Sequence, residues 1–155
     1  MTPNVSIIIP TKNEEKVIGR TLAHLRDSLP KDDYEIIVVD DESADRTAEI
    51  ARAYADQALV RTGEVHGIAR GKNAGAKRAR GEFVVFLDAD CEPEKPLEFF
   101  KKALAIFDAN PHIVGLNCSL KVFPHLATWM DRIVFAGVNL TFRFMNNFLH
   151  TGGSS

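Results

Sequence analysis

The sequence predicts an α/β fold, a three-layer sandwich in which helices cover both faces of a mostly parallel central sheet. Short runs of β-branched and aromatic residues alternate along the chain with segments of helical periodicity. This alternation is typical of β-α-β units, whose crossovers make neighbouring strands parallel. One run, Phe83–Leu87, is apolar throughout, as expected of a strand that is covered on both faces. We take this run as the central strand of the sheet.

The N-terminal part of the chain predicts the first strand and the first helix. Val5–Ile9 is a β-branched run that Pro10 closes. Asn13 is a suitable N-cap for the following helix, because acidic residues come directly after it, where the helix dipole favours them. Pro30 should end this helix. Its buried face should consist of Ile18, Leu22, Leu25 and Leu29.

A second strand is predicted at Tyr34–Val39, which runs into two aspartates. Ser43 or Asp45 can cap the helix that follows. Ala58–Val60 then predicts a short third strand. The apolar face of the intervening helix should include Ile50, Ala51, Tyr54 and Ala55.

A third helix is predicted from about Arg70 to Arg80, ahead of the central strand, and Gly81 is placed to end it as the C′ residue. After the central strand, a proline-containing loop leads into a helix at Leu97–Asp108. Ile113–Val122 alternates apolar and polar residues, which predicts one more strand in a more exposed position.

His125–Leu149 is rich in aromatic and aliphatic residues and carries few charges. Two interpretations stay open for this segment. It forms helices that pack on the domain's own sheet, or it is an amphipathic segment that meets a membrane surface or a lipid-linked substrate. We expect a single domain over residues 1–155, with the sheet core at 1–122 and an apolar helical segment at 123–150. The Gly-Gly-Ser-Ser ending leads us to expect a C-terminal truncation.

The composition limits the classes of function. With 45% hydrophobic residues, 26% charged residues and a net charge of −2, the chain has the balance of a globular domain and none of the basic excess of a nucleic-acid-binding protein. Cys91 and Cys118 show no C-x-x-C spacing, which favours free thiols in a reducing cytosol. No stretch approaches the ~20 apolar residues that span a bilayer. We therefore expect a cytoplasmic location, with the cytoplasmic face of the membrane as a possible site of action.

Polar residues follow the predicted strands in four places. Since the carboxyl ends of parallel strands share one edge of a sheet, these groups should converge there. Cationic side chains and backbone N–H groups suit a diphosphate, and aspartates one residue apart offer oxygen ligands to Mg²⁺ or Mn²⁺. Each group alone has an ordinary alternative as a helix cap, a solvated charge or a turn glycine, so their shared position is the evidence. The groups are Pro10–Glu14, Asp40–Ser43, Gly67–Asn73 and Asp88–Asp90.

Four motifs together resemble the nucleotide-sugar-binding half of family-2 glycosyltransferases, which have the GT-A fold with a Rossmann-like nucleotide-binding sheet. Dolichyl-phosphate-mannose and polyprenyl-phosphate sugar synthases are similar members of that family. The resemblance covers roughly residues 4–92, and the motifs occur in the family's order. They are Val5–Glu15, Ile36–Thr47, the run GIARGKNAGAKRARGE that begins at Gly67, and FVVFLDAD, which ends at Asp90.

The resemblance implies a role for each matching residue. Glu14 would lie near the ribose or base and Asp41 at the base edge, with Asp40 supporting its loop. Asp88 and Asp90 would form the catalytic D-x-D motif and hold Mg²⁺ or Mn²⁺, with Glu92 as a further metal contact. The nucleotide-sugar-binding set is Pro10, Thr11, Asn13, Glu14, Asp40, Asp41, Arg70, Lys72, Asn73, Asp88, Ala89 and Asp90.

The implied reaction is an inverting transfer of a sugar from a UDP- or GDP-sugar to a lipid phosphate or a glycan. In the family, the catalytic base follows a glycine-rich loop. Thr151–Ser155 resembles the start of that loop and is the end of this sequence, so we find no base in this chain. A lipid-phosphate acceptor would need none, because the phosphate is already anionic. The alternative is a catalytically incomplete nucleotide-sugar-binding module that needs a missing C-terminal part or a partner chain. A Rossmann dehydrogenase is disfavoured, since no G-x-G-x-x-G follows the first strand. A sugar-nucleotide pyrophosphorylase is also disfavoured, because it would have a glycine-rich loop with an arginine after the first strand, and this chain has none there.

Overall fold

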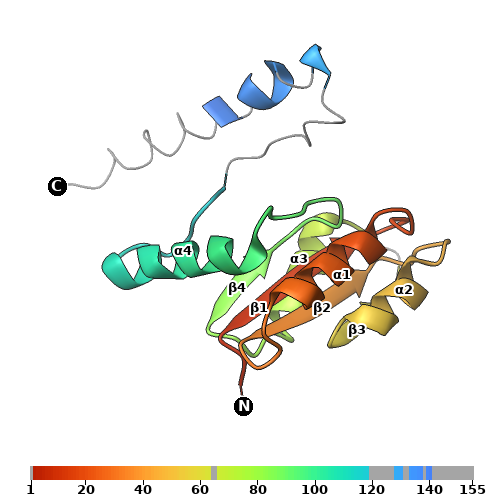
Figure 1. Ribbon diagram of the computed structural model, residues 1–155. Helices are drawn as coiled ribbons and strands as arrows, with labels where there is room; N and C mark the ends of the chain where they lie inside the picture. Colours follow the sequence, from red (N-terminus) through yellow and green to blue (C-terminus); the bar gives the residue numbers. More distant parts are fainter. Residues whose placement is uncertain (1, 64–65, 119–127, 131–132, 138, 141–155) are drawn as a thin grey trace. The chain divides into compact units, whose positions relative to one another are not determined.

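The computed structural model describes residues 2–63, 66–118, 128–130, 133–137 and 139–140 (Figure 1). The chain divides into two units, Met1–Ala109 and Asn110–Ser155. The first unit contains the four strands and the four helices α1 to α4, and it carries every residue proposed above for binding or catalysis. The division falls earlier than the boundary at 122 expected from the sequence, and the expectation of a single domain stays a prediction.

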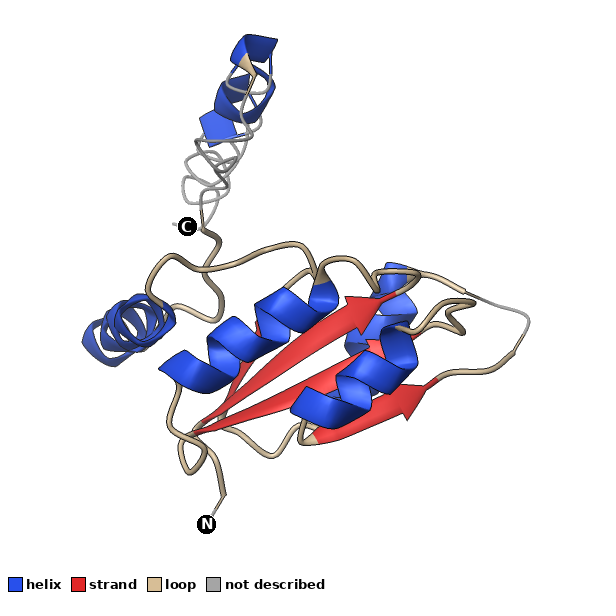
Figure 2. Ribbon diagram, turned by 45° about the vertical axis from the view of Figure 1, so that its right-hand side comes forward, coloured by secondary structure: helices blue, strands red, loops and turns tan. Residues whose placement is uncertain are grey.

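The sheet of the first unit is parallel throughout. Its strands are β1 (Val5–Thr11), β2 (Tyr34–Asp40), β3 (Gln57–Val60) and β4 (Phe83–Phe86), in the order β3-β2-β1-β4. All four coincide closely with predicted strands. Figure 2 shows the strands as red arrows that point the same way. The expected α/β class with a mostly parallel sheet is therefore confirmed.

Helices lie on both faces of this sheet, as the three-layer prediction requires. They are α1 (Ile18–Ser28), α2 (Thr47–Tyr54), α3 (Ile68–Ala76) and α4 (Pro96–Ala109). Side chains of α1, α2 and α4 join one core cluster with alternate residues of the strands, and α3 joins the other cluster from the opposite face. Figure 2 shows α1 and α2 in front of the sheet and α3 behind it.

Strand β1 is buried on both faces, because its alternate side chains enter the two core clusters. Ile7 and Ile9 pack beneath α1, while Ile8 packs beneath α3. The strand continues through Pro10, which the sequence suggested as its end. The amides of Phe83 and Leu87 donate to the carbonyls of Asn4 and Ile8, so the backbone groups of even-numbered residues point toward β4. Pro10 points the same way, beyond the last residue pair with β4. Its missing N–H therefore removes no ladder bond.

The prediction that β4 is a central strand covered on both faces is wrong for the described sheet. β4 lies at the edge, and Val84 and Phe86 on one of its faces are 40% and 48% exposed. Phe83 and Val85 on the other face pack against the larger core. The difference has a simple cause: α3 packs on β1 and β2, and Val84 and Phe86 of β4 are not part of the core cluster on that side of the sheet.

Two predicted helix boundaries also differ from the structure. Helix α1 begins at Ile18, so Asn13 is not its N-cap; Asn13 bonds to the loop after β2 instead. Helix α3 spans 68–76 rather than 70–80, so Gly81 is not its C′ residue. Gly81 lies against β1, where a Cβ atom would come within 2.7 Å of the Ser6 nitrogen. A close approach of two backbones, rather than a helix end, requires glycine here.

The second unit is described only in part. Residues 113–118 form no strand, because no described residue pairs with them, so the predicted strand at 113–122 is wrong over that stretch and its remainder lies outside the described residues. Residues 129–130, 133–137 and 139–140 are helical, in line with the predicted apolar helical segment, whose other residues lie outside the described ones. Throughout the described part of the chain, no helix combines the length and apolar character needed to cross a membrane.

Gly75 of α3 lies much closer to its packing partners than Gly19 of α1 does. A Cβ atom on Gly75 of α3 would collide with Cγ2 of Ile8 and come within 3.2 Å of Cγ2 of Val39, whereas one on Gly19 of α1 would meet only Ile50 at 3.4 Å. Alanine favours both helices by up to about 1 kcal/mol, but overpacking costs about 1–3 kcal/mol. We expect Gly75→Ala to lower the free energy of unfolding by about 1–2 kcal/mol and Gly19→Ala to leave it unchanged or raise it.

Urea titrations of the two variants and the unmodified chain measure both changes. Gly19→Ala is the matched control for helix propensity. Equal effects of the two substitutions would contradict the close packing of α3 on β1.

Candidate functional site

The carboxyl ends of all four strands lie at one edge of the sheet, which we call the carboxyl rim. The loops after β1, β2 and β4 and the N-terminal end of α3 supply its residues. These are the four places in which the sequence predicts polar groups, so the fold brings their segments to one edge. In open α/β sheets this edge is the usual place for a ligand.

The loops after β1 and β2 are bound to each other. The Asn13 amide donates to Ser43 Oγ at 2.8 Å, and the Ala44 amide donates to Asn13 Oδ1 at 2.8 Å. Asn13 adopts a left-handed φ of 56°, which asparagine tolerates better than most residues. Asp40 is buried and accepts from both the Ser43 amide and the Ser43 hydroxyl, at 3.0 and 2.5 Å. Asp40 therefore holds the start of this loop, and its role in nucleotide binding stays a prediction.

Glu14 lies in the loop after β1 and is partly buried. Its amide donates to Thr47 Oγ1 at 2.8 Å, which fixes its backbone to the start of α2. Burial raises the pKa of the Glu14 carboxyl, and the negative charges of Asp90 and Asp45 raise it further. The loops after β1 and β4 therefore both bring carboxylates to the rim.

Asp41 is buried and both of its carboxylate oxygens have partners. Oδ1 lies 2.7 Å from Arg61 Nη1 and 3.3 Å from His66 Nδ1, and Oδ2 accepts from the Gly67 amide at 2.9 Å. Burial by itself raises the pKa of this carboxyl. The bonds from Gly67 and His66 and the charges of His66 and Arg61 outweigh it, so the pKa lies below its usual value. Sequence reasoning missed Arg61 and His66, although Arg61 directly follows β3 and so occupies the rim.

Thr11, the last residue of β1, is 5% exposed. Within the described part of the chain its hydroxyl is buried and has no hydrogen-bond partner. A buried hydroxyl without a partner costs about 1–3 kcal/mol, and a ligand or a water could satisfy it. Pro10 beside it faces α3, where a Cβ on Gly71 would come within 3.0 Å of the proline ring. Pro10 is therefore tightly packed against α3 at the carboxyl end of β1.

Helix α3 presents the cationic residues of the candidate site. Lys72 Nζ lies 3.6 Å from Asp88 Oδ1 and 5.9 Å from the centre of the Phe86 ring. Arg70 and Asn73 are exposed on the same helix, and Arg70 lies in its first turn. The positive end of the helix dipole and the charges of Arg70 and Lys72 together suit a phosphate group.

Asp88 and Asp90 lie in a tight turn after β4, which the Cys91 amide closes by donating to the Asp88 carbonyl at 3.0 Å. Ala89 between them is 4% exposed, whereas both aspartates are exposed. The turn thus directs its middle residue inward and the carboxylates outward. Two carboxylates fit Mg²⁺ or Mn²⁺, since such ions are commonly held by one or two carboxylates together with the phosphates of a substrate.

Glu92 does not join these two aspartates in the structure. Its carboxylate accepts from Arg20 Nε of α1 at 2.5 Å and its side chain is only 13% exposed. Among the described residues, no three carboxylate, histidine or cysteine side chains gather closely enough to hold a metal ion on their own. The metal role of Glu92 stays a prediction.

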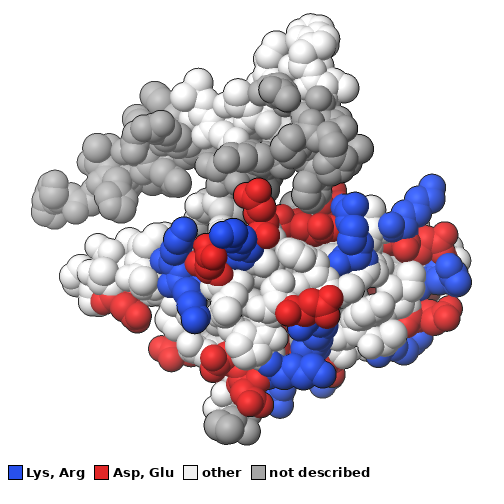
Figure 3. All heavy atoms as spheres, in the orientation of Figure 1, with Lys and Arg blue, Asp and Glu red and all other residues white. Residues whose placement is uncertain are grey.

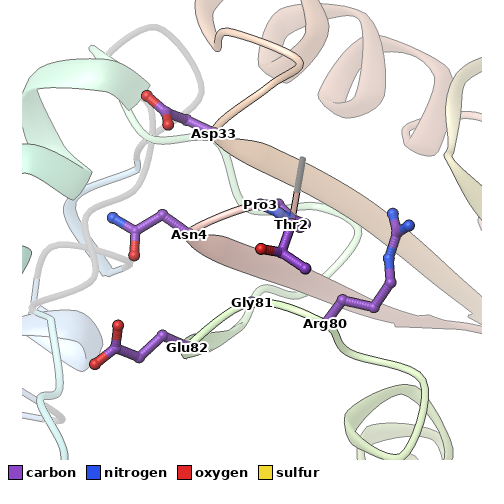
Figure 4. Close-up of a pocket in the computed structure, with 7 residues that line it drawn as sticks. All are labelled: Thr2, Pro3, Asn4, Asp33, Arg80, Gly81 and Glu82. Carbon is purple, nitrogen blue, oxygen red and sulfur yellow. The ribbon is translucent and has the colours of Figure 1, made fainter.

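A pocket of about 400 Å³ lies at the other end of the sheet (Figure 4). Asn4 and Glu82, at the amino ends of β1 and β4, line it with Asp33 and Arg80. Arg80 is already paired with Glu35, whose Oε2 lies 2.7 Å from Arg80 Nη2. We do not assign the functional site to this pocket, because the converging loops lie at the carboxyl rim.

Charged side chains of both signs are interspersed on the face seen in Figure 3. Together with the net charge of −2, this distribution offers no basic stripe for nucleic acid on that face.

Comparison of the sequence with known proteins gives a consistent result. The sequence model described as glycosyl transferase family 2 matches residues 6–151. Poly(ribitol-phosphate) beta-N-acetylglucosaminyltransferase TarS of Staphylococcus aureus is 36% identical over 108 residues, which cover 66% of this chain and 18% of TarS. A Methanococcus voltae protein, described as a dolichyl N-acetyl-alpha-D-glucosaminyl phosphate 3-beta-D-2,3-diacetamido-2,3-dideoxy-beta-D-glucuronosyltransferase, is 26% identical over 143 residues. These cover 85% of this chain and 44% of that protein, so the chain spans less than half of either relative.

Solved structures show the same likeness. The crystal structure of S. aureus TarS 1–349 in complex with UDP has a TM-score of 0.59 and 32% identity, and the match covers 75% of this chain and 38% of that one. Mannosyltransferase PcManGT from Pyrobaculum calidifontis, in complex with GDP-Man and Mn²⁺, has a TM-score of 0.54 and 33% identity. That match covers 61% of this chain and 29% of the mannosyltransferase.

Proposed function

Because the chain belongs to glycosyl transferase family 2, we propose that the protein transfers a sugar from a nucleoside-diphosphate sugar to an acceptor. Its structural neighbours are GT-A glycosyltransferases, so the expected GT-A fold is confirmed. The observation that carries the proposal is the convergence at one rim of the loops after β1, β2 and β4 with the cationic start of α3. The chain covers a small part of TarS, so the activity of the whole protein is part of the proposal.

In this proposal the nucleoside binds between the loops after β1 and β2. Thr11 offers a buried hydroxyl without a partner among the described residues, and Glu14 and Asp41 offer carboxylates for the ribose and the base. The bonds from Asn13 to Ser43 and Ala44 hold the two loops together, so the pocket would be organised before the ligand arrives. Uridine and guanosine both have N–H groups from which Asp41 could accept a hydrogen bond. Both nucleotide types occur in the neighbouring structures, since TarS is described with UDP and PcManGT with GDP-Man.

The diphosphate would lie between α3 and the turn after β4. Arg70, Lys72 and Asn73 would contact its oxygens, and Asp88 and Asp90 would hold Mg²⁺ or Mn²⁺ against it, joined by Glu92 if that residue released Arg20. A bound divalent cation would offset the charge that develops on the departing diphosphate. Mn²⁺ in the PcManGT complex supports this choice of cofactor.

The proposed reaction is a single displacement with inversion at the anomeric carbon. A bond forms between the acceptor oxygen and that carbon as the bond to the diphosphate oxygen breaks. An anionic acceptor such as a lipid phosphate would need no general base, because its oxygen is already anionic, whereas a sugar hydroxyl would have to lose a proton. The name of the Methanococcus relative, which includes a dolichyl-linked phosphate, supports a lipid-type acceptor, and that of TarS supports a glycan-like polymer. A nucleotide-sugar-binding module that needs further chain or a partner is the alternative.

We further propose that the apolar helical segment contacts the cytoplasmic surface of a membrane. In its described part, four large apolar residues are each between 52% and 68% exposed: Trp129, Met130, Ile133 and Val134. The pairs 129/133 and 130/134 are one helical turn apart, as on the apolar face of an interfacial helix.

Substitution of a proposed metal ligand tests the donor site. We expect Asp90→Ala to abolish the Mn²⁺-dependent part of nucleotide binding, measured by calorimetric titration of UDP and GDP with and without the metal. The fold should persist, because the Asp90 side chain is exposed. Asp108→Ala is a matched control, since Asp108 is an exposed carboxylate at the far end of α4. Unchanged metal-dependent affinity in Asp90→Ala would rule out the assignment of the D-x-D motif.

Tryptophan fluorescence tests the membrane contact. Trp129 is the only tryptophan in the chain, so the emission reports on the apolar segment alone. We expect vesicles that contain anionic lipid to shift its emission maximum to shorter wavelength and to co-sediment the chain. An unchanged spectrum with the chain left in the supernatant would contradict membrane contact.

A further inference from the structure

One face of α1 contacts the segment after β4 at three points. Arg20, Thr21 and His24 occupy positions i, i+1 and i+4, which lie within about 100° of one another around the helix. Each of them bonds to a different residue of the segment 89–93. We propose that these three residues are positioning residues, which fix the turn of Asp88 and Asp90 in the orientation that binds the metal and the diphosphate. This inference rests on the proposed function.

Thr21 makes the most buried of the three contacts. Its side chain is fully buried, and its hydroxyl donates to the Ala89 carbonyl at 2.7 Å. Thr21 lies on the core face of α1 beside Leu22 and Leu25, at a place where an aliphatic side chain would serve packing equally well. The hydroxyl is therefore better explained by its bond to the turn than by the stability of the helix.

The bond to Ala89 determines which way the aspartates face. Ala89 is 4% exposed because its backbone is held against α1, whereas its two neighbours point outward from the turn. If the Ala89 carbonyl lost its partner, the turn could rotate, and the carboxylates of Asp88 and Asp90 would move with it. A metal held by two protein ligands is sensitive to such a shift, since outer contacts orient the ligands.

Arg20 and His24 hold the rest of the segment. The Arg20 guanidinium bonds the Glu92 carboxylate at 2.5 Å. His24 Nε2 lies 2.8 Å from the Pro93 carbonyl oxygen, which can only accept, so the bond requires a proton on Nε2. The three contacts together anchor both the turn and its exit toward α4, and they give Glu92 a positioning role in the absence of a ligand.

The test compares metal affinity with nucleotide affinity in the 155-residue chain. Mn²⁺ is titrated in the presence of UDP, and in a parallel series of GDP, and each nucleotide is titrated alone. We expect Thr21→Val, which keeps the shape and removes the hydroxyl, to weaken Mn²⁺ binding about tenfold while metal-free nucleotide affinity changes less than twofold. Thr21→Ser restores the hydroxyl and should recover most of the lost affinity. A purely structural role would weaken both affinities together, and that result, or no loss at all, would overturn the inference.

Arg20→Ala extends the test to a surface position if Thr21→Val does not fold. The Arg20 side chain is 58% exposed, so the substitution spares the core, and Arg52→Ala on the exposed side of α2 is the matched control. We expect Arg20→Ala to weaken Mn²⁺ binding severalfold and Arg52→Ala to leave it unchanged. Unchanged or tighter Mn²⁺ binding in Arg20→Ala would contradict the positioning role and would favour Glu92 as a metal ligand.

Amide hydrogen exchange separates a failure of this inference from a failure of the proposed function. The Cys91 amide closes the turn, so Thr21→Val should speed its exchange while the amides of β1 stay protected. If the unmodified chain bound neither nucleotide with Mn²⁺, the proposed function would fail, and faster Cys91 exchange would still support α1 as the element that holds the turn. Unchanged Cys91 exchange would contradict that role whatever the chain binds.

Discussion

The structure depends on the parallel pairing of β1 with a strand on each side. β1 exchanges backbone hydrogen bonds with β2 along its whole length and with β4 along its first half, and all of its side chains are buried. Such a strand needs cover on both faces, which the crossover helices provide, with α3 brought close by the absence of a side chain at Gly75. Parallel pairing also places every carboxyl end at one edge. The position of the candidate site is thus a consequence of how the core is buried.

Bonds between segments far apart in the sequence then give the rim its form. Asn13 joins the loops after β1 and β2, and Thr21 joins α1 to the turn after β4. Asp41 is bound by Arg61 and His66 from the segment after β3. These contacts hold acidic side chains near one another. Burial raises the pKa of the Glu14 carboxyl most, and repulsion from Asp90 and Asp45 raises it further. A cation and a diphosphate with basic partners would relieve that repulsion, which is the physical reason that the arrangement suits a nucleotide-sugar donor.

Sequence reasoning located the strands and the rim because β-branched runs and the order of elements are local signals. It failed where the outcome depends on distant partners. The apolar run Phe83–Leu87 predicts a strand, but it does not show whether helices cover both faces of that strand. In the structure, alternate residues of β4 are exposed. Asn13 has the chemistry of a cap yet bonds to a loop 30 residues away, and Gly81 has the look of a helix end yet meets β1. Thr21 lies at helical spacing from Ile18 and Leu25, which indicates that it is buried. The sequence does not indicate its partner, the Ala89 carbonyl.

We propose that the donor binds at the carboxyl rim with a metal held by Asp88 and Asp90. Paramagnetic broadening by Mn²⁺ in amide NMR spectra, recorded with UDP and then with GDP, tests it directly. We expect the signals of residues 88–92 to disappear first, followed by those of residues 11–14 and 70–73, and only when the matching nucleotide is present. Broadening centred on Asn4 and Glu82 at the opposite end of the sheet, or no selective broadening with either nucleotide, would contradict it.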